Sequence, residues 1–427
     1  MAHLQSLIAA DAAAVPCPRP PRQALLGPAC VLLAFTLSLP TATGSIAAVL
    51  AMLAWAASGG WRCQWQRWRA SASAMWATAL LAMFLLATSY GHATHAGAWS
   101  VLGKYSKLLL LPVIVMGLTD PRWRARALGA FLIGAVVASL LSYVRFFGLV
   151  PAHLAESIVQ GHIHFGTIEA FAAYAFARLA FEPGRRRWLY AGLAALLCMD
   201  VIYVGTGRTG YVVIFALIVL LGAQRLGVKG LLAGAATALL LAAVAFTVFP
   251  VARMRMDEGL QNLRQYERVQ ATHEGSLREN SWGLRLQFWR NTLHIIARHP
   301  IVGNGTGSMM VEYASVAPKD LDTSNPHNEF LNTTEQIGLI GLALLLGLAV
   351  AAWRDGRRLG AVDRDYAHAV LVTIGVGSLF NSLLMDVNEG RFFVVMLGLL
   401  LAAGVQRGAG ASGRDASAVT GAASPVA

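Results

Sequence analysis

His327 has the side-chain type and the setting of a general base. It lies in the polar segment SNPHNEFLNTTEQ, which leads directly into a long apolar run. Ionisable groups at the edge of lipid are costly unless they face a cavity or a partner. The ordinary pKa of imidazole, about 6.5, allows the neutral ring to accept a proton from a hydroxyl, and nearby cations would lower that pKa further. A purely structural histidine is the competing interpretation.

Arg208 has the chemistry and the setting of an anion ligand. Arg208 lies in GTGRTGY, a glycine-rich turn between two apolar runs. A planar guanidinium binds phosphate oxygens in pairs, and a helix that starts at such a turn adds backbone N–H groups. The alternative for Arg208 is a structural side chain that extends from the apolar region to the interface.

The segment around Arg285 predicts an amphipathic helix from Trp282 to Ile296, on or near the membrane surface. The apolar stripe of this helix consists of Leu286, Trp289, Leu293 and Ile296. Pro300 ends the helix, and the glycine-rich run GNGTG follows at 303–307. No β-α-β pattern surrounds these glycines and no lysine follows them, so they predict a tight packing turn rather than a nucleotide-binding loop.

Several further polar residues lie near the same ends of the predicted spans and are candidates for substrate contact. They are Lys104, Lys107, Arg145, His162, His164, Arg290, Asn328 and Glu389. Asn328 is also placed to cap the following helix or to orient His327. Asp386 and Arg391 crowd the last turn, where we expect a structural ion pair. No His, Cys or Asp residues have convincing metal-ligand spacing, so we expect no metal cofactor.

The composition predicts an all-α polytopic membrane protein. The 427 residues are 56% hydrophobic and only 13% charged, whereas soluble domains carry about 25% charged residues. Many runs are apolar on all sides, unlike the helices of a large soluble protein. We predict about twelve spans of roughly 20 residues each. The predicted regions are a tail at 1–24, spans one to nine in 25–249, a hydrophilic loop region with amphipathic helices at 250–333, spans ten to twelve in 334–406, and a disordered tail at 407–427.

The distribution of basic residues predicts the orientation of the chain. The two tails and the short connections predicted on their side of the membrane hold 19 Lys and Arg residues. The short connections on the opposite side hold only Arg208 and Arg391. Cytoplasmic segments carry the basic excess, so both termini are predicted to be cytoplasmic and 250–333 to face the outside. The formal net charge of +12 is then mostly a consequence of topology and requires no nucleic-acid partner.

Three motifs, in this order, resemble those of the O-antigen ligase/polymerase superfamily, and most of all those of O-antigen ligases. GTGRTGY resembles the arginine motif ahead of a late span, and RLQFWRNTLHIIARHPIVGNGTGS resembles the periplasmic region of the family. PHNEFLNTTEQIGLIGL resembles the H-N-x-x-L…E-x-G-x-x-G-L signature. The resemblance extends over about residues 70–405. Its signature is specific to the superfamily, but not to ligases over polymerases.

The resemblance implies a GT-C-like glycosyltransferase of the bacterial inner membrane with its active site at the periplasmic face. Such enzymes take a glycan from undecaprenyl pyrophosphate, and the ligases join it to a hydroxyl of the lipid A–core oligosaccharide, with inversion and without a metal. Carried over by position, Arg208 and Arg285 would hold the donor pyrophosphate and His327 would activate the acceptor hydroxyl. Fixed guanidinium groups suit this role, because they stabilise the charge that grows on a pyrophosphate leaving group.

Three alternatives remain at this point. An O-antigen polymerase would use another lipid-linked repeat unit as the acceptor, and a protein O-oligosaccharyltransferase would use a secreted protein. A secondary transporter would also fit the number of spans. Transporters usually show internal repeats and broken helices at the midplane, whereas these halves show no repeat and the polar residues gather near one face. We therefore expect an O-antigen ligase that works among membrane lipids.

Overall fold

The structure is a computed structural model that describes residues 25–118, 120–149, 162–205, 207–248, 250–272, 280–317 and 323–420. Within these ranges the chain forms helices and turns without any strand. The first elements are α2 (Leu26–Phe35), η2 (Thr36–Ser38), α3 (Thr41–Ala56), α4 (Trp61–Ala70), α5 (Ala72–Leu86), η3 (Ala87–Ser89), α6 (His95–Tyr105), η4 (Ser106–Leu109), α7 (Leu110–Gly117) and α8 (Pro121–Phe146). The remaining elements are α10 (His162–Ala180), α11 (Arg187–Met199), η5 (Asp200–Val204), α12 (Arg208–Val248), α13 (Pro250–Thr272), α14 (Ser281–Arg298), α15 (Met309–Ala314), α16 (Glu329–Arg357), α17 (Ala361–Gly377) and α18 (Val387–Thr420).

The long apolar helices confirm an all-α polytopic membrane protein. In the described ranges, seven helices are long and apolar enough to cross a membrane, or up to eight if the bent pair α3 and α4 forms one span. Helix α12 reverses direction at Gly227, where φ is 61°. Its two arms lie side by side and in close contact. A Cβ on Gly222 would lie only 2.2 Å from the carbonyl oxygen of Gly230. This close approach of small residues is typical of helices packed in lipid. The predicted count of about twelve spans is not established by these helices.

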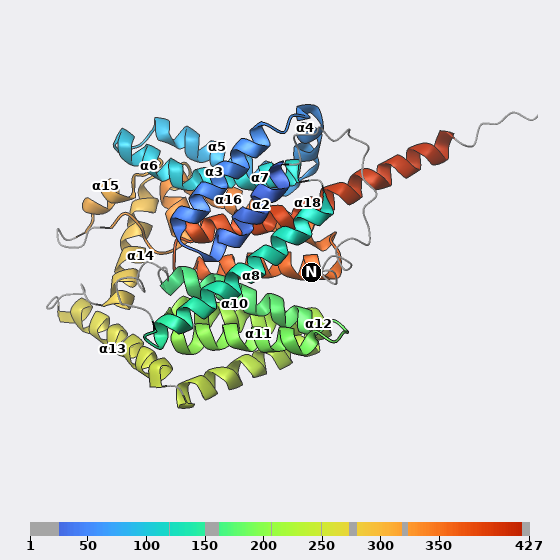
Figure 1. Cartoon of the computed structure of the whole chain (residues 1–427). Coiled ribbons are helices and arrows are strands. Elements are labelled where there is room, and N and C mark those ends of the chain that lie inside the picture. Colours follow the sequence, from blue (N-terminus) through green and yellow to red (C-terminus); the bar gives the residue numbers. More distant parts are fainter. Residues whose placement is uncertain are drawn as a thin grey trace, which may run out of the picture.

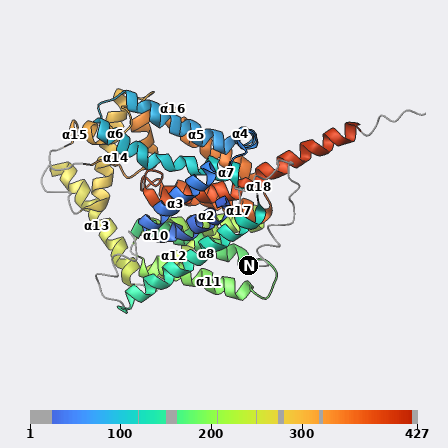
Figure 2. The same cartoon turned by 45° about the horizontal axis from the view of Figure 1, so that its top comes forward.

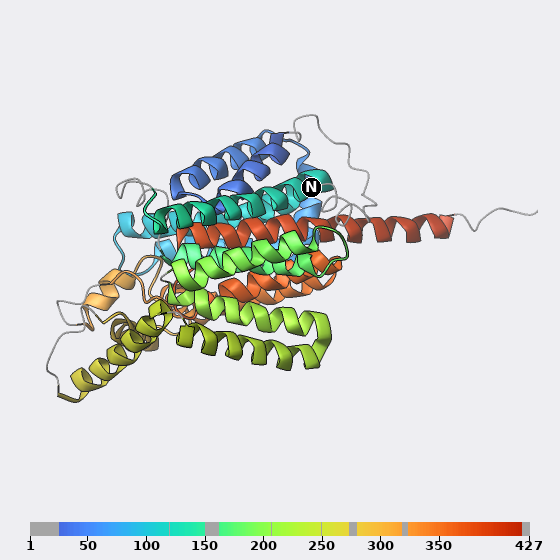
Figure 3. The same ribbon diagram turned by 60° about the horizontal axis from the view of Figure 1, so that its bottom comes forward.

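The bundle has two distinct ends. Helices α13, α14 and α15 gather at one end, on the left in Figure 1, whereas α4 and the far part of α18 lie at the other. The turn of the α12 hairpin is at that second end (Figure 3). The helices of the described part of 250–333 therefore lie at the end of the bundle opposite to α4 and the α12 turn. The direction of the bundle across a membrane stays a prediction.

Helix α18 forms the centre of the bundle. It packs against α7, α8, α10, α16 and α17, and Figure 3 shows it in red through the middle. Phe392, Leu397 and Leu400 are fully buried on it, as expected for a helix that is apolar on all sides. The helix continues to Thr420, through most of the tail that the sequence predicts to be disordered. The alanines of this stretch favour helix, whereas Gly408, Gly410 and Gly413 oppose it.

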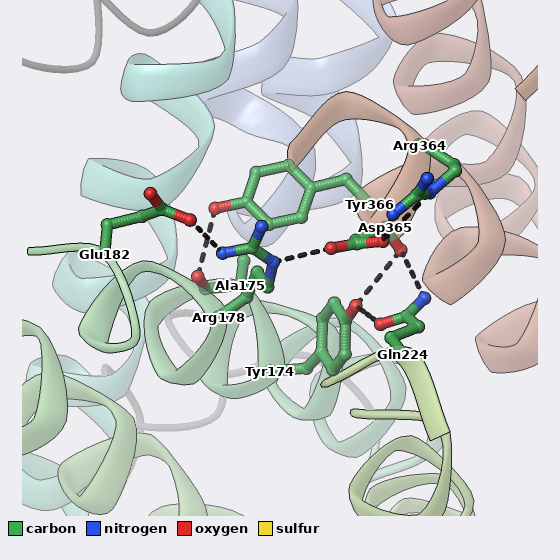
Figure 4. Close-up of polar contacts among 8 residues, drawn as sticks. All are labelled: Tyr174, Ala175, Arg178, Glu182, Gln224, Arg364, Asp365 and Tyr366. Atoms are coloured by element: carbon green, nitrogen blue, oxygen red, sulfur yellow. Dashed lines mark hydrogen bonds and ion pairs between the residues drawn. The ribbon is translucent and has the colours of Figure 1, made fainter. Parts of the chain in front are cut away.

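A buried ion-pair cluster joins α10, α12 and α17 near the hairpin end of the bundle (Figure 4). Arg178 Nε lies 2.6 Å from Asp365 Oδ2, and Arg178 also pairs with Glu182. The Tyr174 hydroxyl donates to Gln224 Oε1 at 2.5 Å and to the Asp365 carbonyl oxygen at 3.1 Å. Charges inside a membrane protein are tolerated when they are paired in this way. The cluster explains the charged residues inside these helices without a catalytic role.

Candidate active site at the α13–α15 end of the bundle

A tight turn holds His327 directly before α16. Its backbone has a φ of 55°, the only positive value at a non-glycine position in the described ranges. This conformation costs an L-residue roughly 1–2 kcal/mol. The Asn325 side chain offsets that cost, because its Oδ1 accepts the His327 N–H at 2.8 Å, and such asparagine turns are a standard way to stabilise this geometry. The turn therefore sets the direction of the His327 side chain.

The imidazole of His327 is partly buried beside α14. Its ring lies over that of Phe288, with centroids 6.1 Å apart and 23° between the ring planes. Burial, and secondarily the positive charge of Arg285, lower the pKa of His327 to about 4. No described residue forms a hydrogen bond with either ring nitrogen. The ring is consequently neutral at pH 7 and available as a proton acceptor.

Arg285 lies on the second turn of α14, a helix that begins where Asn280 Oδ1 accepts the Gly283 N–H at 2.6 Å. Its Nη2 donates to Asn381 Oδ1 at 3.2 Å. Burial lowers the pKa of Arg285, and the charge of Arg208 lowers it further, although arginine stays protonated at any physiological pH. Arg208 and Arg285 are therefore close enough to repel each other.

Arg208 is the first residue of α12 and is only partly exposed. Its Nη2 pairs with Glu258 Oε2 of α13 at 3.1 Å. Its Nη1 is buried and has no hydrogen-bond partner among the described residues. An unpaired buried donor on a cation is costly, and the nearby charge of Arg285 adds repulsion. A bound anion would relieve both costs, and the helix start would contribute backbone N–H groups to it.

The structure thus brings three residues from α12, α14 and the start of α16 to one place. Residues 193–346, which contain all three, match the family model described as O-Antigen ligase. This match supports membership of the chain in the O-antigen ligase superfamily. No curated protein matches the chain. The family implies a glycosyltransferase-like membrane enzyme and suggests lipid-linked glycans as its substrates.

The O-antigen ligase domain, as we call residues 193–346, contains a broken helix that the sequence does not predict. Helix α16 is interrupted at Ile337 and Gly338, where Gly338 has a φ of 65°. The break leaves four backbone groups of α16 without their helical partners, and the segment 300–305 pairs with all four. The replacing bonds run from Leu339 N to Pro300 O (2.8 Å), Ile340 N to Ile301 O (3.3 Å), Asn304 N to Glu335 O (2.9 Å) and Gly305 N to Gln336 O (2.9 Å). Buried backbone groups in a membrane protein require such partners.

The glycine-rich run at 303–307 is the packing turn that the sequence predicts. Gly303, Gly305 and Gly307 all have positive φ. A Cβ on Gly303 would lie 2.5 Å from the Gln336 carbonyl carbon, and one on Gly305 would lie 2.2 Å from the Tyr90 carbonyl oxygen. The turn is therefore wedged between the break in α16 and the end of α5. It fixes the half-helix that follows His327.

The polar residues of that half-helix are buried among partners rather than exposed to a substrate. Glu329 accepts hydrogen bonds from the Tyr105 hydroxyl at 2.8 Å and from the backbone N–H groups of Leu384 and Met385. Glu335 Oε1 accepts one from Ser308 at 2.8 Å. Asn328 caps the helix, since its Oδ1 accepts the Leu331 N–H at 3.1 Å. This is the capping role considered for Asn328, which leaves its substrate contact a prediction.

The packing of α14 differs in part from its prediction. The helix is confirmed, and it contacts α13, α15 and α16 (Figure 2). Phe288 and Ile295 are its buried apolar residues, and they form a small core with Met309 and Tyr313 of α15. Leu293, from the predicted stripe, is 56% exposed. Leu286, Trp289 and Ile296 of the stripe are half-buried, and α15 covers the neighbouring face that carries Phe288 and Ile295.

Two of the basic candidates make contacts within the protein. Lys107 Nζ donates to the carbonyl oxygens of Met385, at 3.0 Å, and Asp386. Arg290 Nη1 donates to Gln270 Oε1 of α13 at 2.9 Å. These contacts hold the segment before α18 and the packing of α13 on α14.

The other candidates are dispersed. Lys104 and Arg145 are half-buried near the ends of α6 and α8, and Glu389 is buried in α18. His164 is buried in α10, with both ring nitrogens unpartnered among the described residues. The side chain of His162 lies outside the described residues. Among the described residues, no hydrogen bond or ion pair joins these candidates to His327, and their substrate contacts stay predictions.

The expected ion pair between Asp386 and Arg391 does not form. Arg391 Nη2 donates to Ser45 Oγ at 2.8 Å, and its Nη1 donates to the Thr41 carbonyl oxygen. Asp386 precedes α18, whereas Arg391 lies one turn inside it and faces α3. The predicted ion pair is therefore wrong, because the two residues are close in sequence but Arg391 contacts α3. Among the described residues, no three His, Cys, Asp or Glu side chains are grouped so that they could hold a metal ion.

Proposed function

We propose that the protein is an O-antigen ligase, which transfers O-antigen polysaccharide from undecaprenyl pyrophosphate to a sugar hydroxyl of lipid A–core. The observation that carries the proposal is the pairing of two close arginines with a neutral histidine. Arg208 has an unpartnered buried Nη1, and the charge of Arg285 acts on both Arg208 and His327. An anion site next to a proton acceptor is what this transfer requires.

The reaction is a single displacement. A nitrogen of the neutral His327 ring accepts the proton of the acceptor hydroxyl while its oxygen attacks the anomeric carbon of the donor glycan. The bond from that carbon to the pyrophosphate oxygen breaks on the opposite face, and the electron pair leaves with the lipid pyrophosphate. The anomeric configuration is inverted as a result. Two fixed guanidinium groups stabilise the growing charge, and each is worth roughly 3–4 kcal/mol in a site of this kind.

The arginines carry the charge that a divalent metal carries in many pyrophosphate enzymes, so we propose a metal-independent reaction. Glu258 occupies Nη2 of Arg208 in this structure. The incoming pyrophosphate would compete with this carboxylate for the guanidinium. Glu258 therefore pairs with the Arg208 nitrogen that the pyrophosphate would bind.

We further propose that the site faces the periplasm and that both termini are cytoplasmic. The basic residues of the short segments support this orientation, as does the location of α13, α14 and α15 at one end of the bundle. Reporter fusions at residue 420 and within 273–279 test it. Reporter activity that is periplasmic at residue 420 would contradict the orientation.

Deletion of the gene tests the reaction itself. Loss of a ligase leaves uncapped lipid A–core on gels while lipid-linked polymer accumulates in the membrane. Loss of a polymerase would instead leave core that carries one repeat unit. Unchanged lipopolysaccharide together with unglycosylated secreted proteins would indicate a protein O-oligosaccharyltransferase. Either of the last two results would overturn the ligase proposal.

A further inference from the structure

The connection between α17 and α18, residues 378–386, contacts every segment that carries a candidate catalytic or donor-binding residue. It lies outside the O-antigen ligase domain at 193–346. Its side chains and carbonyl groups form hydrogen bonds with the start of α12, with α14 and with the turn before α16. We refer to residues 378–386 as the α17–α18 connection.

Within this connection, Asn381 joins the two arginine segments. Its Oδ1 accepts from Arg285 Nη2 at 3.2 Å, and its Nδ2 donates to Thr209 Oγ1 at 2.8 Å. Thr209 is the neighbour of Arg208 on the first turn of α12. Asn381 is 1% exposed, so its amide cannot exchange these partners for water. Only a side-chain amide offers an acceptor and two donors on one short group. Asn381 therefore sets the separation of two cations that would otherwise move apart.

The next residue, Ser382, joins the connection to the histidine turn. Its Oγ donates to Asn325 Oδ1 at 2.6 Å, the same oxygen that accepts the His327 N–H at 2.8 Å. The serine thereby fixes the asparagine that holds His327 in its left-handed conformation. Ser382 is fully buried, which makes this arrangement rigid.

Further contacts anchor the part of the connection that precedes these residues. The Ser378 carbonyl oxygen accepts the Glu329 N–H at 2.9 Å, and the Leu379 carbonyl oxygen accepts from Asn328 Nδ2 at 3.0 Å. The ring of Phe380 packs edge-on against that of Trp282 on α14, with centroids 6.3 Å apart. The connection is therefore held in place independently of Asn381 and Ser382.

We infer that the α17–α18 connection positions the site, with Asn381 as the positioning residue of the arginine pair and Ser382 as that of His327. This inference rests on the proposed function and deepens it. Because the two residues act on different partners, they should affect different steps. Asn381 should govern the binding of the donor pyrophosphate, and Ser382 should govern proton transfer at His327.

The test uses the full chain in lipid nanodiscs and two readouts that do not depend on turnover. Inorganic pyrophosphate binding is measured by calorimetry, and the His327 ring is titrated by nitrogen NMR, with its signal assigned by its absence in His327→Gln. For Asn381→Ala we expect pyrophosphate Kd to rise about tenfold, as for loss of a hydrogen bond to a charged group. Thr209→Val, which removes one hydroxyl, should weaken binding in the same direction by about threefold.

For Ser382→Ala we expect pyrophosphate Kd to stay within about twofold of the wild type, while kcat for glycan transfer falls about fivefold, as for loss of a neutral hydrogen bond. The NMR midpoint of His327 should move upward from about 4 as the ring becomes mobile and solvated. Ser382→Thr keeps the hydroxyl and should restore kcat. The matched control is Ser378→Ala, which leaves the backbone carbonyl contact of that residue intact.

The inference is overturned if Asn381→Ala and Thr209→Val both leave pyrophosphate Kd unchanged, or if Ser378→Ala causes losses equal to those of the other variants. It is also overturned if Ser382→Ala leaves both kcat and the His327 titration unchanged. A wild-type protein that binds pyrophosphate but transfers no glycan would contradict the proposed function instead, and the binding and NMR results would still decide the positioning roles.

Discussion

Phe288 and His327 stack with their ring centroids 6.1 Å apart and 23° between the ring planes. Phe288 lies three residues after Arg285 on α14, so the two side chains share one face of that helix. One helix therefore carries a donor-site cation and supports the proposed base. Movement of α14 would shift Arg285 and Phe288 together, because both lie on that helix.

The pH dependence of the reaction should reflect the lowered pKa of His327. The folded-state pKa is about 4, below the value of about 6.5 for a free histidine. We expect kcat/KM to be flat from pH 8 to about 5 and to fall with a midpoint near 4. The unfolded chain binds the proton first, so this residue lowers stability as pH falls from about 6.5 toward 4. A kinetic midpoint near 6.5 would contradict the buried, neutral imidazole.

Removal of the three site residues should abolish transfer without loss of expression. We expect Arg208→Ala and Arg285→Ala each to lower kcat by about 10²–10³-fold, and His327→Ala by about 10²–10⁴-fold. Transfer is followed as polysaccharide-capped lipid A–core on gels and as kcat in nanodiscs. Arg298→Ala is the matched control, because Arg298 lies on the same helix as Arg285 but pairs with Ser315 Oγ at 3.0 Å. Normal capping in cells that carry only His327→Ala would exclude the general-base role.

Glu258→Gln should improve donor binding. The change removes the carboxylate that pairs with Arg208 Nη2 at 3.1 Å. Because the pair is partly exposed, it is worth about 0–1 kcal/mol, so the donor KM should fall by no more than about fivefold. Glu267→Gln, an exposed position on the same helix, supplies the same charge change as a control. An increase in donor KM would mean that Glu258 holds Arg208 in its working position.

Gly338→Ala should destabilise the protein. The residue has a φ of 65°, and its Cβ would lie 2.1 Å from the Ile301 carbonyl oxygen. The left-handed backbone alone costs about 1–2 kcal/mol, and the clash with backbone adds to it. Thermal unfolding in nanodiscs should show a lower Tm. Gly375→Ala is the control, since nothing lies within 4 Å of that Cβ and alanine favours helix, so its Tm should stay equal or rise.

Transfer should persist in the presence of EDTA. Two guanidinium groups provide the positive charge at the proposed pyrophosphate site, and they do not depend on a divalent ion. The measurement is glycan transfer by purified protein after exhaustive chelation. Loss of transfer that a single divalent ion restores would contradict the metal-independent proposal.

Much of the membrane architecture could be predicted because its signals are local. Helical runs that are apolar on all sides indicate membrane spans. Pro300 indicates the end of a helix, and the GNGTG run that follows indicates a tight turn. The break at Gly338 escaped prediction because a single glycine is tolerated within an apolar helix. The break depends on the backbone of residues 300–305, a separate segment that supplies the hydrogen bonds missing from α16.

The sequence by itself determined which side chains can do chemistry, because a histidine base and guanidinium cations are properties of residue type. Only the tertiary structure decided that Arg208, Arg285 and His327 meet, and which residues hold them. Asn381 lies 96 residues from Arg285 and 172 residues from Thr209, and no spacing rule links such distant positions. Their contacts depend on how α12, α14 and the α17–α18 connection pack, which is a property of the whole fold.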